Sequence, residues 1–170
     1  ARTVVPSDWD KMHDGNEVVS PERRAEARVN DPRWKPVEQR WRPSADGKWY
    51  WKGDTSSDEI IGHFNGFYVY YTLMDDEAEK ERVRKLTRRI MDYIIEGGYN
   101  LNDTDGTHTH WAVWAPEKLM GDPDWRAESG INSAELLMFL KTSYFITGDK
   151  KYQEHYEKLI KDYGYAENAR

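Results

Sequence analysis

The residues whose types and spacing best suit chemistry are carboxylates next to predicted helix starts. Asp58 opens an apolar helical segment, and Glu117 follows Pro116 in a long connection. Hydrolysis of a glycosidic bond needs two carboxyl groups that face each other across the bond, one of them protonated. We predict Asp58 and Glu117 as this pair, with His63 as a further acid–base candidate. A buried, hydrogen-bonded histidine is the alternative for His63, and the first turn of a short helix is the alternative for Glu117.

Glu59, the acid next to Asp58, is predicted to cap the helix and not to take part in catalysis. Residues 56–59 align with residues 132–135, and in each segment a Glu stands three positions after Ser or Asn. This spacing is typical of a capping box, in which the acid accepts a hydrogen bond from the N-cap amide. We therefore expect Glu59 and Glu135 to be structural, whereas capping gives Asp58 no role.

Tryptophan is unusually frequent in a hydrophilic chain. The 170 residues have a mean hydropathy of −0.98 and include eight tryptophans, at positions 9, 34, 41, 49, 51, 111, 114 and 125. All eight lie outside the predicted helices, and a flat indole can stack on the C–H face of a sugar. For Trp9, Trp34 and Trp41 we favour packing within the first fifty residues over a role in binding.

Five further candidates flank the two loops that would lead into the apolar helices. Trp51 and Asp54 precede the first helix, while His110, Trp111 and Trp114 lie in the long connection before the third. Aromatic rings with convergent polar groups are typical of ligand sites, so we predict these five residues to bind substrate. Packing is the alternative for the tryptophans, and a turn position is the alternative for Asp54.

A β-hairpin is predicted within the long connection. Residues 102–106 read Asn-Asp-Thr-Asp-Gly, a strong turn signal, and alternation through residues 107–111 indicates a return strand. The turn does not fit a calcium-binding EF-hand loop, since its first and twelfth positions would hold Leu and Ala. His108 and His110 would share one strand face, but two ligands without a third are weak grounds for a metal. We expect no metal and no cofactor.

Helices must position these side chains, and periodicity predicts four of them, at residues 56–74, 77–97, 132–147 and 150–163. The first and third are apolar nearly all round, which predicts inner helices buried on most sides, whereas the second and fourth carry one apolar stripe and are predicted as outer helices. The expected fold class is therefore mainly α. Two αα-hairpins (domain 53–170) would follow an irregular, Trp-rich N-terminal segment (1–52).

Composition excludes several classes of function. The chain has no cysteine, which removes disulfides, thiolate metal sites and cysteine nucleophiles. With 25 basic and 31 acidic residues its formal charge is −6, so nucleic acids and anionic membranes are poor partners. No apolar run approaches 18 residues, and the first residues show no signal-peptide pattern.

Alternating inner and outer helices joined by Trp-rich loops resemble the (α/α)₆ toroids of six-hairpin glycosidases and polysaccharide lyases, over roughly residues 49–165. The turn at 144–152 resembles a hairpin turn common in these proteins, and residues 51–59 and 111–117 are similar to segments of uncharacterised, mostly Bacteroidetes-type relatives. The resemblance implies a cleft at the entrances of the inner helices. It also implies action on a poly- or oligosaccharide, in a secreted or periplasmic protein.

Two hairpins cannot close a ring of six, so we expect part of a larger chain, a shortened relative or a homo-oligomer. Three alternatives to a glycoside hydrolase follow. The first is a non-catalytic glycan-binding or scaffolding module, and the second is a helical interaction domain with an interface around Tyr70 and Leu73. The third is a polysaccharide lyase, which would use His63 or His110 with a tyrosine. The negative net charge disfavours a polyuronate substrate.

Overall fold

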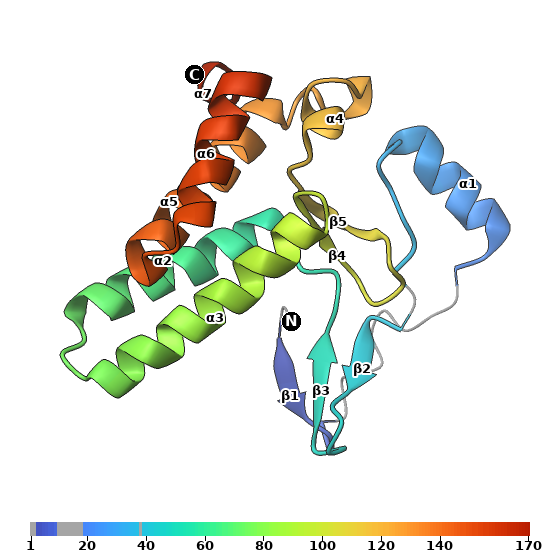
Figure 1. Cartoon of the computed structure of the whole chain (residues 1–170). Coiled ribbons are helices and arrows are strands. Elements are labelled where there is room, and N and C mark those ends of the chain that lie inside the picture. The colour runs from blue at the N-terminus through green and yellow to red at the C-terminus, as the bar shows by residue number, and fades with distance from the viewer. Residues whose placement is uncertain (1–2, 10–18, 38) are drawn as a thin grey trace.

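The computed structural model describes residues 3–9, 19–37 and 39–170, shown in Figure 1. This part of the chain is mainly helical with two small antiparallel sheets, which confirms the predicted fold class. Its elements in chain order are β1 (Val4–Pro6), α1 (Pro21–Asn30), β2 (Trp41–Pro43), β3 (Trp49–Lys52), α2 (Ser57–Leu73), α3 (Glu77–Glu96), β4 (Asn100–Asn102), β5 (His108–Val113), α4 (Pro116–Leu119), the 3₁₀ turn η1 (Pro123–Trp125), α5 (Ser129–Thr147), α6 (Lys150–Tyr163) and α7 (Tyr165–Asn168).

The two predicted αα-hairpins are α2–α3 and α5–α6, and their local start and stop signals act as expected. The backbone N–H of Ser56 donates to Glu59 Oε2 at 2.8 Å, which confirms the capping box at the start of α2. Gly148 ends α5 with a φ of 73°, a left-handed conformation that disfavours a side chain. The following Asp149 is the N-cap residue of α6, and its carboxylate pairs with Arg88 of α3.

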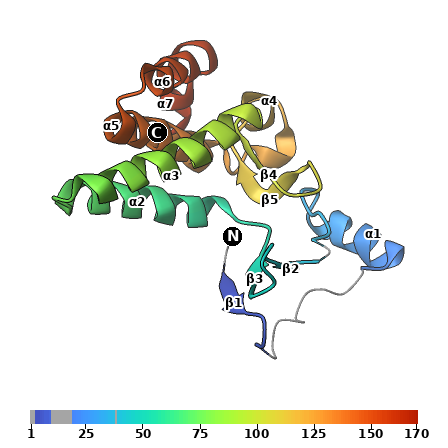
Figure 2. The ribbon, with the colours of Figure 1, turned by 60° about the horizontal axis from the view of Figure 1, so that its bottom comes forward.

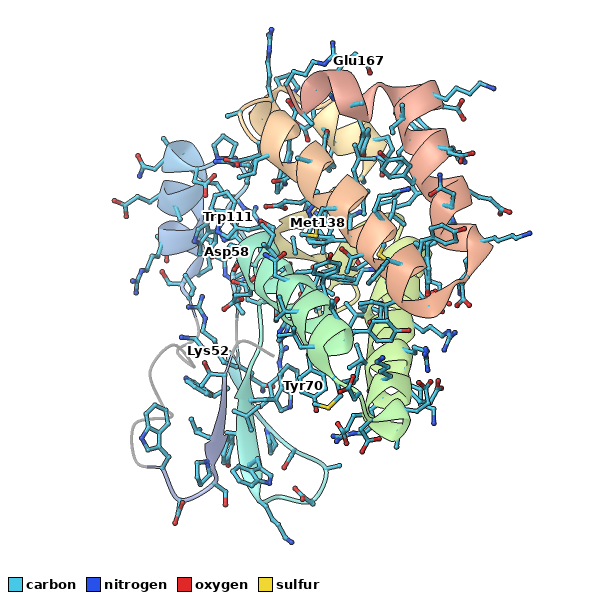
Figure 3. The ribbon with its side chains drawn as sticks, turned by 90° about the vertical axis from the view of Figure 1, so that its left-hand side faces the viewer. Lys52, Asp58, Tyr70, Trp111, Met138 and Glu167 are labelled. Atoms are coloured by element: carbon cyan, nitrogen blue, oxygen red, sulfur yellow. The ribbon has the colours of Figure 1, made fainter. Side chains whose placement is uncertain are left out.

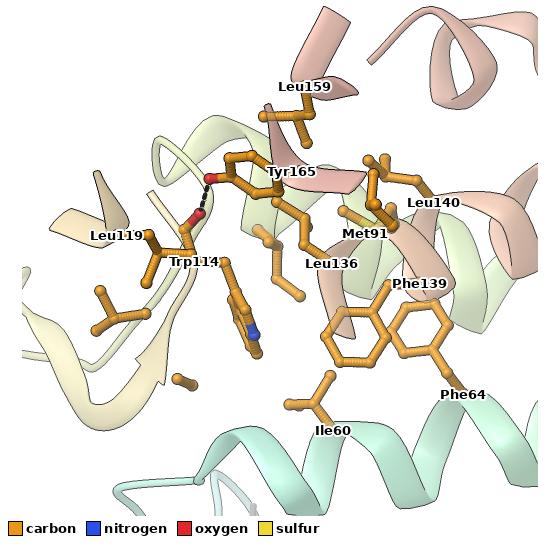
Figure 4. Packing of buried hydrophobic residues seen from close by; sticks show 14 of the residues in the cluster. Ile60, Phe64, Met91, Trp114, Leu119, Leu136, Phe139, Leu140, Leu159 and Tyr165 are labelled. Carbon is orange, nitrogen blue, oxygen red and sulfur yellow. Dashed lines mark hydrogen bonds between the residues drawn. The ribbon is translucent and has the colours of Figure 1, made fainter. Parts of the chain in front are cut away.

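Helix α5 lies at the centre of the core and contacts α2, α3, α6 and α7. Its Phe139 packs against Phe64 of α2, with 4.7 Å between ring centroids, and meets the edge of Trp114 at 5.3 Å. Figure 4 shows these rings together with the aliphatic side chains of the same cluster. The hydroxyl of Tyr165 donates to the backbone oxygen of Trp114 at 2.5 Å and so ties α7 to the end of β5.

Helix α2 is less buried than its sequence predicts. Ile60 and Phe64 are its buried residues, whereas Tyr68, Val69 and Leu73 are 46%, 52% and 76% exposed. The prediction that α2 is covered on most sides is therefore wrong for this chain. The physical reason is that α2 packs on α3 and α5 along one side, while no helix of the described residues lies against its other side (Figure 2).

The N-terminal segment is not irregular, and this part of the prediction is wrong. Strand β3 pairs antiparallel with both β1 and β2, giving the order β1-β3-β2, with Val4 opposite Trp51 and Trp41 opposite Lys52. Figure 2 places this sheet and α1 on the side of α2 that faces away from α5 and α6. A buried ion pair joins the sheet to the β4–β5 hairpin, with Arg42 Nη1 2.6 Å from Asp103 Oδ1.

Most of the tryptophans lie in this sheet or in the loops, outside the long helices. Trp41 is 6% exposed and meets the ring of Trp9 edge-on at 5.6 Å, which confirms packing for Trp41. Trp9 itself is 37% exposed, and Trp34 is half-buried. Trp125 lies in η1, so the prediction that every tryptophan lies outside helices is wrong at this position. In the described part of the chain, no helix is long and apolar enough to cross a bilayer.

Candidate functional site

A cavity of about 550 Å³ lies where α2 and α5 begin. The coil before α2 contributes Asp54, and the first turn of α2 contributes Asp58. Strand β5 contributes Trp111, Glu128 is the N-cap residue of α5, and Glu135 lies within that helix. Figure 3 shows Asp58 and Trp111 close together at the start of α2. The cavity therefore forms at the entrance to the two apolar helices, where the sequence predicts a site.

Asp54 holds the wall of this cavity in place. It is 6% exposed, adopts a φ of 55°, and its Oδ1 accepts a hydrogen bond from the backbone N–H of His110 at 2.8 Å. The carboxylate therefore joins the coil before α2 to strand β5. Asp54 lines the cavity as predicted for a binding residue, and it also holds the turn, which was its alternative role.

His110 and Trp111 both line the cavity, but they are already engaged. Their rings stack at a centroid distance of 4.3 Å and an interplanar angle of 7°. The guanidinium of Arg33 lies 4.6 Å from the Trp111 centroid, and His110 Nε2 lies 3.1 Å from Asp31 Oδ2. These contacts leave Trp111 less free ring surface than the prediction of sugar stacking assumed. The pair forms a fixed aromatic wall.

Trp114 does not line the cavity, and its assignment to substrate binding is wrong. The side chain is 0% exposed and belongs to the hydrophobic core around Phe139. Its Nε1–H donates to Glu135 Oε2 at 2.7 Å. Trp114 thus forms the floor beneath the site. The reason is that residues 112–116 are all buried, so the alternation between core and surface already stops within β5, before Trp114.

Glu135 differs in position from what the sequence predicts. The spacing from Asn132 predicts a capping box, but α5 begins at Ser129, so Glu135 lies within the helix. The side chain is 5% exposed and lines the cavity. Burial raises the pKa of Glu135, and the negative charges of Asp58 and Glu128 raise it further. Hydrogen bonding from Trp114 and Ser57 lowers this pKa, but the raising effects are larger. Glu135 is the single acidic residue within α5, and this was the signal that could have identified it.

Glu117, His63 and Trp51 lie outside this cavity. Glu117 is exposed in the first turn of α4 behind Pro116, which confirms its alternative interpretation. His63 is also exposed, so the prediction of an interior histidine is wrong, and it stacks on Phe67 at 6.1 Å. His63 and Trp51 instead line a separate, mostly apolar cavity of about 530 Å³ between β3, α2 and α3. The predicted pair of Asp58 and Glu117 is therefore not brought together.

The two strand histidines do not converge on a metal. His108 Nδ1 lies 2.8 Å from the backbone oxygen of Thr109, and its ring meets Trp125 edge-on at 6.2 Å. It lines a different cavity from His110. Among the residues that the structure describes, no group of three or more His, Asp or Glu side chains is arranged to hold a metal ion.

Comparison with protein-family models, with curated proteins and with solved structures finds no match to this chain.

Proposed function

We propose that this chain is a carbohydrate-active domain that binds a poly- or oligosaccharide in the cavity at the start of α2 and α5. The domain is glycoside hydrolase-like and belongs to a secreted or periplasmic protein, as its resemblance to part of an (α/α)₆ toroid implies. The observation that carries the proposal is the gathering of Asp54, Asp58, Glu128 and Glu135 around one cavity beside the wall of His110 and Trp111.

Sugar hydroxyls donate hydrogen bonds, and carboxylates are strong acceptors for them. The cavity also offers a donor, because Arg40 Nε is buried there and has no hydrogen-bond partner within the described part of the chain. A small set of polar groups on a partly apolar wall is the usual composition of a ligand site. Asp58 is the exposed carboxylate among the four and is the first to meet an entering ligand.

Replacing Asp58 by alanine is expected to weaken saccharide binding about tenfold or more, since a charge-assisted hydrogen bond contributes on the order of 1.5–3 kcal/mol. Isothermal titration calorimetry against a panel of neutral and acidic oligosaccharides measures this. Glu117→Gln is the matched control, because Glu117 is exposed outside the cavity and its loss leaves affinity unchanged. Absence of binding to every saccharide by the wild-type protein would contradict the proposal.

The uncovered side of α2 favours a second function, association through helices. Tyr68, Val69 and Leu73 form an exposed apolar strip on α2, and Phe145 of α5 extends it, with its ring 5.3 Å from that of Tyr68. Contiguous apolar surface of this kind marks interaction sites. We infer that another copy of the chain, or further hairpins of a larger protein, packs on this strip.

Sedimentation velocity tests this second function. The protein is expected to dimerise at micromolar concentration, and Val69→Glu with Leu73→Glu is expected to yield monomers, because each substitution places a charge in the apolar contact. Val29→Glu is the control, since Val29 is 84% exposed on α1, away from α2. A wild-type protein that sediments as a monomer throughout the concentration series would rule out self-association.

A further inference from the structure

The four carboxylates of the cavity differ in their hydrogen-bond and ion-pair partners. Asp54 accepts the N–H of His110, as described, and Glu128 Oε1 lies 3.0 Å from Arg33 Nη1 in an ion pair. These two therefore serve the walls of the cavity. Asp58 and Glu135 have other partners, the Ser56 hydroxyl and the Trp114 indole, and they come from two different helices that meet at this point.

Glu135 is held in one orientation by groups that cannot move easily. The indole of Trp114 donates to it at 2.7 Å, and that indole is itself fully buried against Phe139. A positioned carboxyl group at the wall of a ligand cavity is what proton transfer to a bound substrate requires.

Glu135 and Asp58 differ in burial, and this difference favours Glu135 as the proton donor and Asp58 as the proton acceptor. Glu135 is buried, and its pKa is raised by that burial and by the charge of Asp58, so it keeps its proton at higher pH than a free Glu. Asp58 is exposed at the cavity mouth and accepts a hydrogen bond from the Ser56 hydroxyl. Two carboxyl groups in unlike environments can divide the two roles between them.

Resting on the proposed function, we propose that Glu135 is the proton donor for cleavage of a glycosidic bond in this cavity, and that Asp58 is the carboxylate that receives a proton from the attacking water. The proton of Glu135 moves to the glycosidic oxygen as the bond from the anomeric carbon to that oxygen breaks. The bonding electron pair leaves with the oxygen. Water then forms the new bond to the anomeric carbon and gives one proton to Asp58. The substrate class is a saccharide with an unactivated leaving group, for which proton donation matters most.

Glu135→Gln tests this role, because the glutamine oxygen still accepts from Trp114 and the fold is retained. The assay compares each of a series of oligosaccharides with the 2,4-dinitrophenyl glycoside of the same sugar, whose leaving group departs without a proton. The variant is expected to lose kcat/KM by about 100-fold or more on the oligosaccharide and by less than about tenfold on the aryl glycoside. Asp58→Asn is expected to lower both, and Glu117→Gln neither.

A pH profile separates donation from a structural role. Wild-type kcat/KM is expected to fall as pH rises through the pKa of Glu135, and this limb disappears in Glu135→Gln. Equal losses on both substrates, or a limb that persists in the variant, would overturn the assignment. Wild-type protein that binds saccharides but hydrolyses none of the series overturns the assignment and leaves the proposed function standing. Failure to bind any saccharide overturns both.

Discussion

Replacing Trp114 by alanine is expected to lower the free energy of unfolding by about 4 kcal/mol. The indole is 0% exposed and packs edge-on against Phe139 within the core around α5, so its removal leaves a large cavity. The substitution also removes the Nε1–H that Glu135 accepts, and a buried carboxyl without its donor is costly. Urea unfolding followed by circular dichroism at 222 nm measures the change.

Trp49→Ala is the matched control for this substitution. Trp49 lies in β3 and is 45% exposed, so its replacement is expected to cost less than about half as much. A loss of less than about 1.5 kcal/mol for Trp114→Ala would show that the core does not depend on this ring.

Replacing Asp103 by alanine is expected to cost about 3 kcal/mol, the second largest effect that we expect from a single substitution. The Asp103 side chain is 6% exposed and that of Arg42 is 15% exposed, so the change leaves a guanidinium buried without its partner. Because the pair joins the β1-β3-β2 sheet to the β4–β5 hairpin, amide hydrogen exchange is expected to speed up in β2 and β3 as stability falls.

A double variant distinguishes the loss of a partner from the net contribution of the pair. In Arg42→Met with Asp103→Leu both charges are absent, and the expected loss is below about 1 kcal/mol, since apolar residues replace buried ion pairs at little cost. Stability that is unaffected in Asp103→Ala would contradict the buried pair.

The Asp103 pair also predicts a dependence on pH. Burial raises the pKa of Asp103, but hydrogen bonds from Arg42 and from the Thr104 N–H outweigh this, so its pKa is lowered in the fold. The stabilisation is therefore fully present above the pKa of a free Asp, about 3.9, and is lost as pH falls through the lower folded value. Asp103→Ala is expected to remove this part of the acid sensitivity.

Local signals accounted for most of the helical fold. Periodicity placed the four long helices to within a few residues, apart from the earlier start of α5 at Ser129. The Asn-Asp-Thr-Asp-Gly turn identified the β4–β5 hairpin, in which Asn102 pairs with His108. The capping box at Ser56 and the helix end at Gly148 involve groups close in the sequence, so a single segment contains the information.

What the sequence did not predict depends on contacts between distant segments. Strands β1 and β3 pair although they stand more than forty residues apart, and each is too short to show a clear pattern of its own. The alignment of Glu135 with Glu59 suggested equal roles, yet only Glu59 lies at a helix start. Trp111 and Trp114 stand three residues apart at the end of the same strand. Trp111 lines the cavity and Trp114 is buried in the core, a difference that only the fold reveals.

The hydrogen bond between Trp114 and Glu135 has a consequence for how this domain can evolve. Any lineage that replaces the indole leaves a buried acid without its donor, and any lineage that replaces the acid with an apolar residue leaves a buried N–H without its acceptor. Each single step is therefore harmful, whereas the joint step is tolerable. Among homologous sequences the two positions are expected to change together, and their pairing would show which descendants keep the cavity chemistry.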